Sequence, residues 1–315
     1  MYDVICIGSA LLDIYLKSDK FKKVAAVDFA DGWALCEEYG GKIEMQEAEV
    51  ASGGGGTNNA VSFARKGLKT GLIAEVGKDL VAATIKAELT REGVDLSMVS
   101  EIEGEETGLS SILVALDGGR SALIYRGASK MLTKEDIKWD QIQAKWLYIS
   151  SLGGEMALLE GLIGHAKTNS IKVTVNPGKS ELEIMSGQQI KLFEGIEVLL
   201  LNREEAAQLT GLPLHEDPAW RGTWAIPGPR YVVVTDGKDG GLVMGGGDKF
   251  FYEAEKVEVV EETGAGDAFG SGLVAALIVG KDIHTAVEWG KKQASSVVSF
   301  MGAKRGLLRL DQITG

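Results

Sequence analysis

The chain has 315 residues, which is enough for one large α/β domain with a sizeable hydrophobic core. It carries 33 basic and 45 acidic residues and has a formal net charge of −12, which argues against non-specific binding to nucleic acid or to an anionic membrane. Hydrophobic residues make up 45% of the chain and charged residues 25%, as in globular proteins and unlike mostly disordered ones.

The N-terminal segment and the cysteines predict a cytoplasmic protein. Two cysteines, Cys6 and Cys36, are too few for a disulfide framework in a chain of this size. The apolar N-terminal segment contains Asp3 and Asp13 and has no basic start, so we expect a buried strand there rather than a signal peptide. No apolar run approaches the ~18 residues that a membrane-spanning helix requires.

Short apolar runs alternate with longer amphipathic segments along most of the chain. The expected strands are 4–8, 72–76, 146–150, 173–176, 198–202 and 231–235. The expected helices are 57–66, 79–91, 156–167, 203–209, 267–279 and 283–301. Continuous apolar strands that alternate with helices indicate a doubly wound, mostly parallel sheet covered on both faces.

Other segments break this alternation and predict a small second sheet. Residues 109–116 and 121–125 flank Asp117-Gly118-Gly119, which is a hairpin signal. We expect the lid to be formed by residues 13–20, 42–51 and 109–126, inserted in a single domain that spans 1–315. The exposed edge of such a sheet can pair with a second copy of the chain, so we expect a homodimer through the lid.

The most informative segment is a glycine-rich turn that leads into the helix expected near residue 268. It follows a polar strand expected at 257–260 and reads Thr263-Gly264-Ala265-Gly266-Asp267. Small residues at a helix start leave backbone N–H groups uncovered, so the segment predicts an anion site for a phosphoryl group. A carboxylate beside it can accept the proton of an attacking hydroxyl. The alternative is that Asp267 only caps the helix.

A second glycine-rich segment, Gly53–Gly56, opens the helix expected at 57–66. Glycines let the backbone approach a ligand closely, and the Asn58 amide offers both a donor and an acceptor. This combination suits a polyhydroxyl ligand. The alternative is a flexible loop with Asn58 or Asn59 as the helix cap.

Four motifs together resemble those of the ribokinase-like carbohydrate kinase family, also called the phosphofructokinase-B family. Gly53-Gly54-x-x-x-Asn58 is similar to its sugar signature and Thr263–Asp267 to its C-terminal signature. Between them, 202–205 is similar to its N-x-x-E element and 234–241 to its nucleotide loop. The resemblance extends from about residue 3 to about residue 309, and the order and spacing of the four motifs make it specific.

The resemblance implies an ATP-dependent phosphotransferase that transfers the γ-phosphoryl group to a hydroxyl of a neutral sugar of the ribose, fructose or keto-deoxy type. Asp267 would be the catalytic base, and the backbone amides of Gly264, Ala265 and Gly266 would form the anion hole. Substrate would be bound by Asp13, Gly54, Asn58 and Asp267. A nucleoside kinase of the same family is the alternative. A non-catalytic sugar sensor is a further one, against which the intact Asp267 and Glu205 argue.

The resemblance also implies the cofactors. ATP would be bound by Asn202, Thr235, Gly237, Gly266 and Gly302, and Mg²⁺ by Asn202 and Glu205, partly through water. The need for a monovalent cation such as K⁺ is left open, because Glu261-Glu262 replaces the Asp-Thr that usually begins the C-terminal signature.

Two further features bear on the substrate and on the surface. Leu109 stands where phosphosugar kinases of the family often place an arginine, which disfavours a phosphorylated substrate. Residues 213–229, with Trp220 and Trp224, look like a surface insertion whose function the sequence does not indicate.

Overall fold

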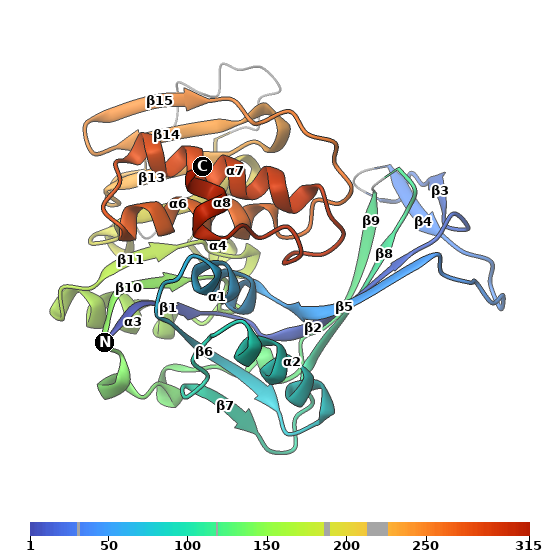
Figure 1. The fold of residues 1–315 in the computed structure, drawn as a ribbon, viewed down its shortest axis with the longest axis horizontal. Coiled ribbons are helices and arrows are strands. Elements are labelled where there is room, and N and C mark those ends of the chain that lie inside the picture. The colour runs from blue at the N-terminus through green and yellow to red at the C-terminus, as the bar shows by residue number, and fades with distance from the viewer. Residues whose placement is uncertain (30–31, 118, 186–189, 213–225) are drawn as a thin grey trace.

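The computed structural model describes residues 1–29, 32–117, 119–185, 190–212 and 226–315 (Figure 1). Most of the insertion expected at 213–229 therefore lies outside the described residues. The larger of the sheets has nine strands in the order β15-β14-β13-β12-β11-β10-β1-β6-β7. Neighbours from β13 to β7 are parallel, whereas β14 and β15 are antiparallel additions at one edge. The predicted doubly wound, mostly parallel sheet is confirmed.

The strand bounds follow the apolar runs closely. The nine strands are β1 (Tyr2–Ile7), β6 (Thr70–Gly77), β7 (Val99–Ile102), β10 (Ala144–Ile149), β11 (Lys172–Val175), β12 (Val198–Asn202), β13 (Tyr231–Thr235), β14 (Gly241–Gly245) and β15 (Asp248–Tyr252). Alternate side chains of one strand point to opposite faces. In β1, Val4 and Cys6 join one hydrophobic core and Ile5 and Ile7 the other. Both faces of the sheet are therefore buried, which explains why these strands read as unbroken apolar runs.

Helices cover both faces of this sheet. One core takes side chains from α1 (Gly55–Arg65), α2 (Leu80–Arg91), α6 (Ala265–Ile278), α7 (Ile283–Val298) and α8 (Leu310–Thr314). The other takes them from α3 (Met156–Thr168), α4 (Lys179–Met185) and α5 (Arg203–Thr210). Short 3-10 helices are η1 (Gly127–Lys130), η2 (Lys134–Asp136), η3 (Trp139–Gln141), η4 (Ile190–Phe193) and η6 (Gly237–Asp239).

A smaller four-stranded sheet projects from one side of this body (Figure 1). Its order is β5 (Glu47–Gly53), β2 (Leu11–Lys17), β8 (Gly108–Val114) and β9 (Arg120–Tyr125). β2 and β8 are parallel, and the other pairs are antiparallel. These strands come from the three segments expected to form a lid. A separate hairpin of β3 (Lys22–Ala25) and β4 (Trp33–Cys36) was not predicted.

Some sequence expectations were wrong in detail. Residues 257–260 form no strand, and the Val260 amide instead donates to the Val298 carbonyl at the end of α7. The β14–β15 hairpin forms one edge of the nine-stranded sheet. The apolar pattern of the sequence did not predict this hairpin. α1 begins two residues earlier than expected, at Gly55, and its N-cap is Gly54 rather than an asparagine.

Candidate active site

Two helix starts meet at the carboxyl ends of the central strands. α1 begins directly after β5 of the small sheet, and α6 begins after the glycine-rich turn. The two helices pack against each other. Since the carboxyl edge of a parallel sheet with a change in strand order is where such folds bind ligands, this junction is the candidate site.

The Asp267 carboxylate occupies the gap between these two helices. Its Oδ2 accepts a hydrogen bond from Asn58 Nδ2 at 2.9 Å, and its Oδ1 accepts one from Asn59 Nδ2 at 3.1 Å. The N-cap of α6 is Gly264, and the N-cap of α1 is Gly54. The alternatives in which Asp267, Asn58 or Asn59 only caps a helix are therefore wrong. The carboxylate is held by two amides across the junction, with both oxygens oriented.

The surroundings change the acidity of this carboxyl group. Burial raises the pKa of Asp267 above its ordinary value, while the hydrogen bonds from Asn58 and Asn59 and the charge of Lys304 oppose the rise. A base whose pKa is raised toward neutrality accepts a proton more readily once it is ionised. The site thus keeps an oriented carboxylate that can receive a proton.

The start of α6 provides amides for an anion. Gly264 has φ +78°, a left-handed conformation in which a Cβ would lie 2.5 Å from the Cβ of Ala303. The Ala265 amide already donates to the Glu262 carbonyl at 3.2 Å. In the described part of the chain, the Gly264 and Gly266 amides have no hydrogen-bond acceptor, and a Cβ on Gly266 would meet open space. Of the three amides expected to form the anion hole, those of Gly264 and Gly266 are therefore available to an anion, whereas that of Ala265 is already hydrogen-bonded.

The expected sugar side lies where the small sheet joins the body. Asp13 on β2 is 5% exposed, and its carboxylate accepts hydrogen bonds from the Ser110 hydroxyl and, at 3.2 Å, from the Tyr15 hydroxyl. Burial raises its pKa, and these hydrogen bonds oppose the rise. A Cβ on Gly53 would overlap this carboxylate, and one on Gly54 (φ +88°) would lie 2.6 Å from the Ser9 carbonyl oxygen. The glycines are needed because the backbone passes this close.

The expected nucleotide residues lie at several places. Asn202 and Thr235 pair in register at the carboxyl ends of β12 and β13, and Gly237 begins η6 two residues later. Gly302 has φ +87° and lies in the loop after α7, where a Cβ would be 3.6 Å from the Tyr15 ring. Asn202, Thr235 and Gly237 are thus neighbours, whereas Gly302 lies against the small sheet.

Asn202 and Glu205 form a capping box at the start of α5. Asn202 Oδ1 accepts from the Glu205 amide, and Glu205 Oε2 accepts from the Asn202 amide, both at 2.8 Å. Burial raises the pKa of Glu205. This bonding leaves Glu205 Oε1 outside the box, so the pair fits Mg²⁺ as an oxygen donor set that acts partly through water. The N-x-x-E pattern is thus also a capping signature, a role that sequence analysis did not assign.

Several residues of this site were not predicted from the sequence. Asn59, Tyr15, Ser110 and the buried Lys304 all bond to expected site residues. Asn59 carried a signal, because it adjoins Asn58. Lys304 carried none, because a lysine beside Arg305 in a loop is indistinguishable from a solvated charge.

Comparison with known proteins identifies the class to which this fold and site belong. The family model described as pfkB family carbohydrate kinase matches residues 1–308. The chain therefore belongs to this family of carbohydrate kinases, and the predicted resemblance and enzyme class are confirmed.

Individual relatives are distant. A ribokinase from Haemophilus influenzae is 28% identical over 273 residues, which cover 85% of this chain and 88% of that protein. A 5-dehydro-2-deoxygluconokinase from Geobacillus thermodenitrificans is 29% identical over 279 residues, 83% of this chain and 82% of the relative. The solved ribokinase of Arabidopsis thaliana, with ribose and ATP, has a TM-score of 0.77 at 22% identity and covers 99% and 97% of the two chains. A nucleoside kinase from Methanocaldococcus jannaschii has a TM-score of 0.78, also at 22% identity, over 100% and 97%. These two structures establish the fold.

The described residues contain no helix that is both long and apolar enough to cross a bilayer. Within the same ranges, no three or more His, Cys, Asp or Glu side chains gather as a metal-binding cluster.

Gly264→Ala tests the backbone requirement at the start of α6. We expect it to lower the free energy of unfolding by about 1–3 kcal/mol, because alanine disfavours the left-handed conformation and its Cβ would press on Ala303. Gly266→Ala is the matched control. Its Cβ meets open space in a helix, so we expect no loss of stability or a gain of up to about 1 kcal/mol. Urea denaturation measures both, and equal losses would contradict the argument.

Proposed function

We propose that this carbohydrate kinase transfers the γ-phosphoryl group of ATP to a hydroxyl of a neutral sugar, with Asp267 as the base. The observation that carries the proposal is the Asp267 carboxylate, held by Asn58 and Asn59 beside the Gly264 and Gly266 amides at the start of α6, which are free among the described residues. A carboxylate next to backbone amides matches what phosphoryl transfer to an alcohol requires, namely a proton acceptor beside a stabilised phosphoryl group.

In the proposed reaction, the sugar hydroxyl gives its proton to Asp267 as its oxygen attacks the γ-phosphorus. The bond between that phosphorus and the bridging oxygen breaks, and ADP leaves with the electron pair. The Gly264 and Gly266 amides and the dipole of α6 stabilise the charge on the transferring group. Kinases of this family use ATP with Mg²⁺. Glu205 and Asn202 would hold Mg²⁺, which supplies charge neutralisation between the phosphates.

The neutral character of the sugar is supported by the side chains around the junction. Asp13, Asn58 and the backbone at Gly53–Gly54 offer hydrogen-bonding groups for hydroxyls. Leu109 pairs with Leu12 in register between β8 and β2 and brings no cation to this part of the sheet. The names ribokinase and deoxyribokinase also favour a small neutral sugar, whereas 5-dehydro-2-deoxygluconokinase names a sugar acid and favours only the absence of a phosphate.

We also propose that residues 1–315 act as one kinase domain with the small sheet as its lid. Free thiols at Cys6 and Cys36 support a cytoplasmic location.

Asp267→Asn tests the base. The variant keeps the shape of the side chain but removes the proton acceptor, so we expect kcat to fall by about 10²- to 10⁴-fold with the circular dichroism spectrum unchanged. Asp282→Asn is the control. Asp282 caps α7 through the Thr285 amide at 2.8 Å, and asparagine caps a helix equally well, so its kcat should equal that of the unchanged chain. A near-normal kcat in Asp267→Asn would remove the mechanism.

A substrate panel tests the acceptor. We expect kcat/KM with ATP and Mg²⁺ to be higher for ribose, fructose or 2-keto-3-deoxygluconate than for adenosine, cytidine or inosine. A preference for a nucleoside would replace the sugar assignment, and no turnover of any of them would favour the sugar sensor.

Parallel assays with potassium or tetramethylammonium chloride decide the cation requirement. The Glu261-Glu262 pair left this requirement open, and the Glu261 carboxylate lies 3.3 Å from the Arg120 guanidinium.

A homodimer through the lid is also proposed. The small sheet and the separate β3–β4 hairpin expose large apolar side chains at Trp33, Val50, Leu123, Ile124 and Tyr125, and large exposed apolar side chains on one sheet favour a protein interface. We expect sedimentation to give the mass of a dimer. A Leu123→Lys, Ile124→Lys double variant should give that of a monomer. A monomeric mass for the unchanged chain would contradict this proposal.

A further inference from the structure

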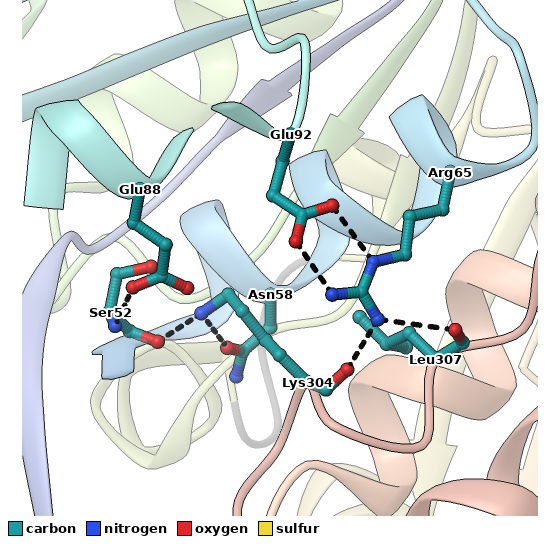
Figure 2. Close-up of polar contacts among 7 residues, drawn as sticks. All are labelled: Ser52, Asn58, Arg65, Glu88, Glu92, Lys304 and Leu307. Carbon is teal, nitrogen blue, oxygen red and sulfur yellow. Dashed lines mark hydrogen bonds and ion pairs between the residues drawn. The ribbon is translucent and has the colours of Figure 1, made fainter. Parts of the chain in front are cut away.

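A buried lysine in the loop after α7 contacts the same Asn58 carboxamide that contacts Asp267. Lys304 is 4% exposed, and its ammonium donates to the Ser52 carbonyl oxygen and, at 2.7 Å, to Asn58 Oδ1 (Figure 2). It also donates to Thr57 Oγ1 at 2.9 Å. These acceptors lie where β5 of the small sheet passes into α1. One cation thus holds together the segment that carries the sugar-binding glycines and the Asn58 amide.

The hydrogen bonds around Asn58 leave its carboxamide one orientation. An ammonium can only donate and an ionised carboxylate can only accept. Lys304 therefore takes the amide oxygen, and the amide nitrogen must face Asp267, to which it donates at 2.9 Å. Without the ammonium, a flipped amide would turn its oxygen toward the carboxylate and would lose that hydrogen bond.

We propose that Lys304 is a positioning residue for phosphoryl transfer: through the Asn58 amide, it keeps the Asp267 carboxylate turned toward the substrate hydroxyl. The proposal rests on the proposed role of Asp267 as the base. Lys304 touches neither the substrate nor the phosphates in this account, and it acts through one intervening side chain.

The backbone of the same loop is fastened to α1 by a second cation. Arg65 Nη1 donates to the Lys304 carbonyl at 2.7 Å and to the Leu307 carbonyl at 3.2 Å (Figure 2). The guanidinium is itself oriented by Glu92, which it contacts with two hydrogen bonds of 2.9 and 2.6 Å. Because the loop is held at its main chain, the ammonium of Lys304 is presented at a constant place.

Acidic groups surround the lysine and favour its charged form. Glu88 accepts from the Ser52 amide at 2.6 Å, beside the carbonyl that Lys304 contacts. Burial lowers the pKa of Lys304 to about 8, with Arg65 adding to the shift and Glu88, Asp13 and Asp267 opposing it. A cavity of about 760 Å³ reaches Lys304, so water and protons have access to it. Its other charged lining residues are Glu47, Glu49, Arg65, Glu88, Arg91 and Arg305.

Deprotonation of the Lys304 ammonium distinguishes a positioning role from a purely structural one, because activity and stability respond to it differently. A neutral amine has two donors for three acceptors, so the hold on Asn58 weakens as the pH rises through about 8. Between that pH and the ordinary lysine pKa, the unfolded chain binds a proton that the folded chain has lost. This group therefore stabilises the folded state increasingly as the pH rises. Activity and the stability contribution of Lys304 should move in opposite directions.

Lys304→Met tests the proposal by removing the three donors at nearly constant side-chain length. We expect kcat to fall about 10- to 100-fold, since a hydrogen bond from a charged group is lost, with KM for ATP within about twofold. Lys66→Met is the control for losing a buried ammonium. Lys66 bonds to Ser62 Oγ at 2.9 Å and does not contact Asn58, so its kcat should stay within about twofold. Equal kcat values for Lys304→Met and the unchanged chain would overturn the proposal.

A double-mutant cycle identifies the route. If Lys304 acts through Asn58, then Lys304→Met should cost less than about twofold in kcat when Asn58→Ala is already present. The same loss in both backgrounds would show that Lys304 acts by another route and would overturn the proposal.

Two pH measurements complete the test. For the unchanged chain, we expect kcat to fall above about pH 8 with no decrease in the free energy of unfolding over that range. A kcat that stays level to pH 9.5 would contradict the proposal even if Lys304→Met does not fold. In Lys304→Met, this alkaline decrease should be absent.

The pKa of Asp267 can be measured without catalytic turnover. Lys304→Met should raise the pKa of Asp267, followed by carbon-13 NMR of labelled aspartate, because a charge that lowers it is gone and the Asn58 donor is no longer held. An unchanged pKa would overturn the proposal. If no sugar or nucleoside is phosphorylated by the unchanged chain, the proposed function fails, while this measurement still decides the contact between Lys304 and the base.

Discussion

The contact on which the site depends is the pair of hydrogen bonds that joins the start of α1 to the start of α6. Asn58 and Asn59 belong to one helix and Asp267 to the other, and each amide takes one carboxylate oxygen. A carboxylate between two helix starts is stabilised by both dipoles. The Gly264 and Gly266 amides beside this contact have no acceptor in the described part of the chain, so the proton acceptor and the anion site lie at the same helix start.

Close packing at this junction is possible only because glycines line it. A Cβ at Gly55 would lie 2.8 Å from the Ser150 side chain, and one at Gly264 would press on Ala303. The loop that carries Ala303 also carries Lys304, which binds the far side of the Asn58 amide. The junction is therefore surrounded by three segments from distant parts of the chain, and its geometry depends on all of them.

Much of the fold could be read from local patterns. Buried parallel strands are continuous apolar runs because both faces are covered, and β12 and β13 were predicted with their observed bounds. Strands β3, β4 and β15 were missed because their side chains are exposed or only partly buried, so hydrophobicity does not mark them. β14 was missed although Leu242 and Val243 are buried, because its apolar run between two glycines is short. The strand expected at 257–260 was wrong because apolar alternation alone does not provide a pairing partner.

The sequence by itself determined the family, the α/β architecture and the residue types of the site, because glycine-rich turns and apolar periodicity are local properties of the chain. Only the tertiary structure decided that Asn58 meets Asp267, 209 residues further on, and that Lys304 is buried against the Asn58 amide. Helix packing sets those distances. A lysine in a loop becomes a structural cation only when distant carbonyl and amide oxygens converge on it, and no stretch of neighbouring residues encodes that convergence.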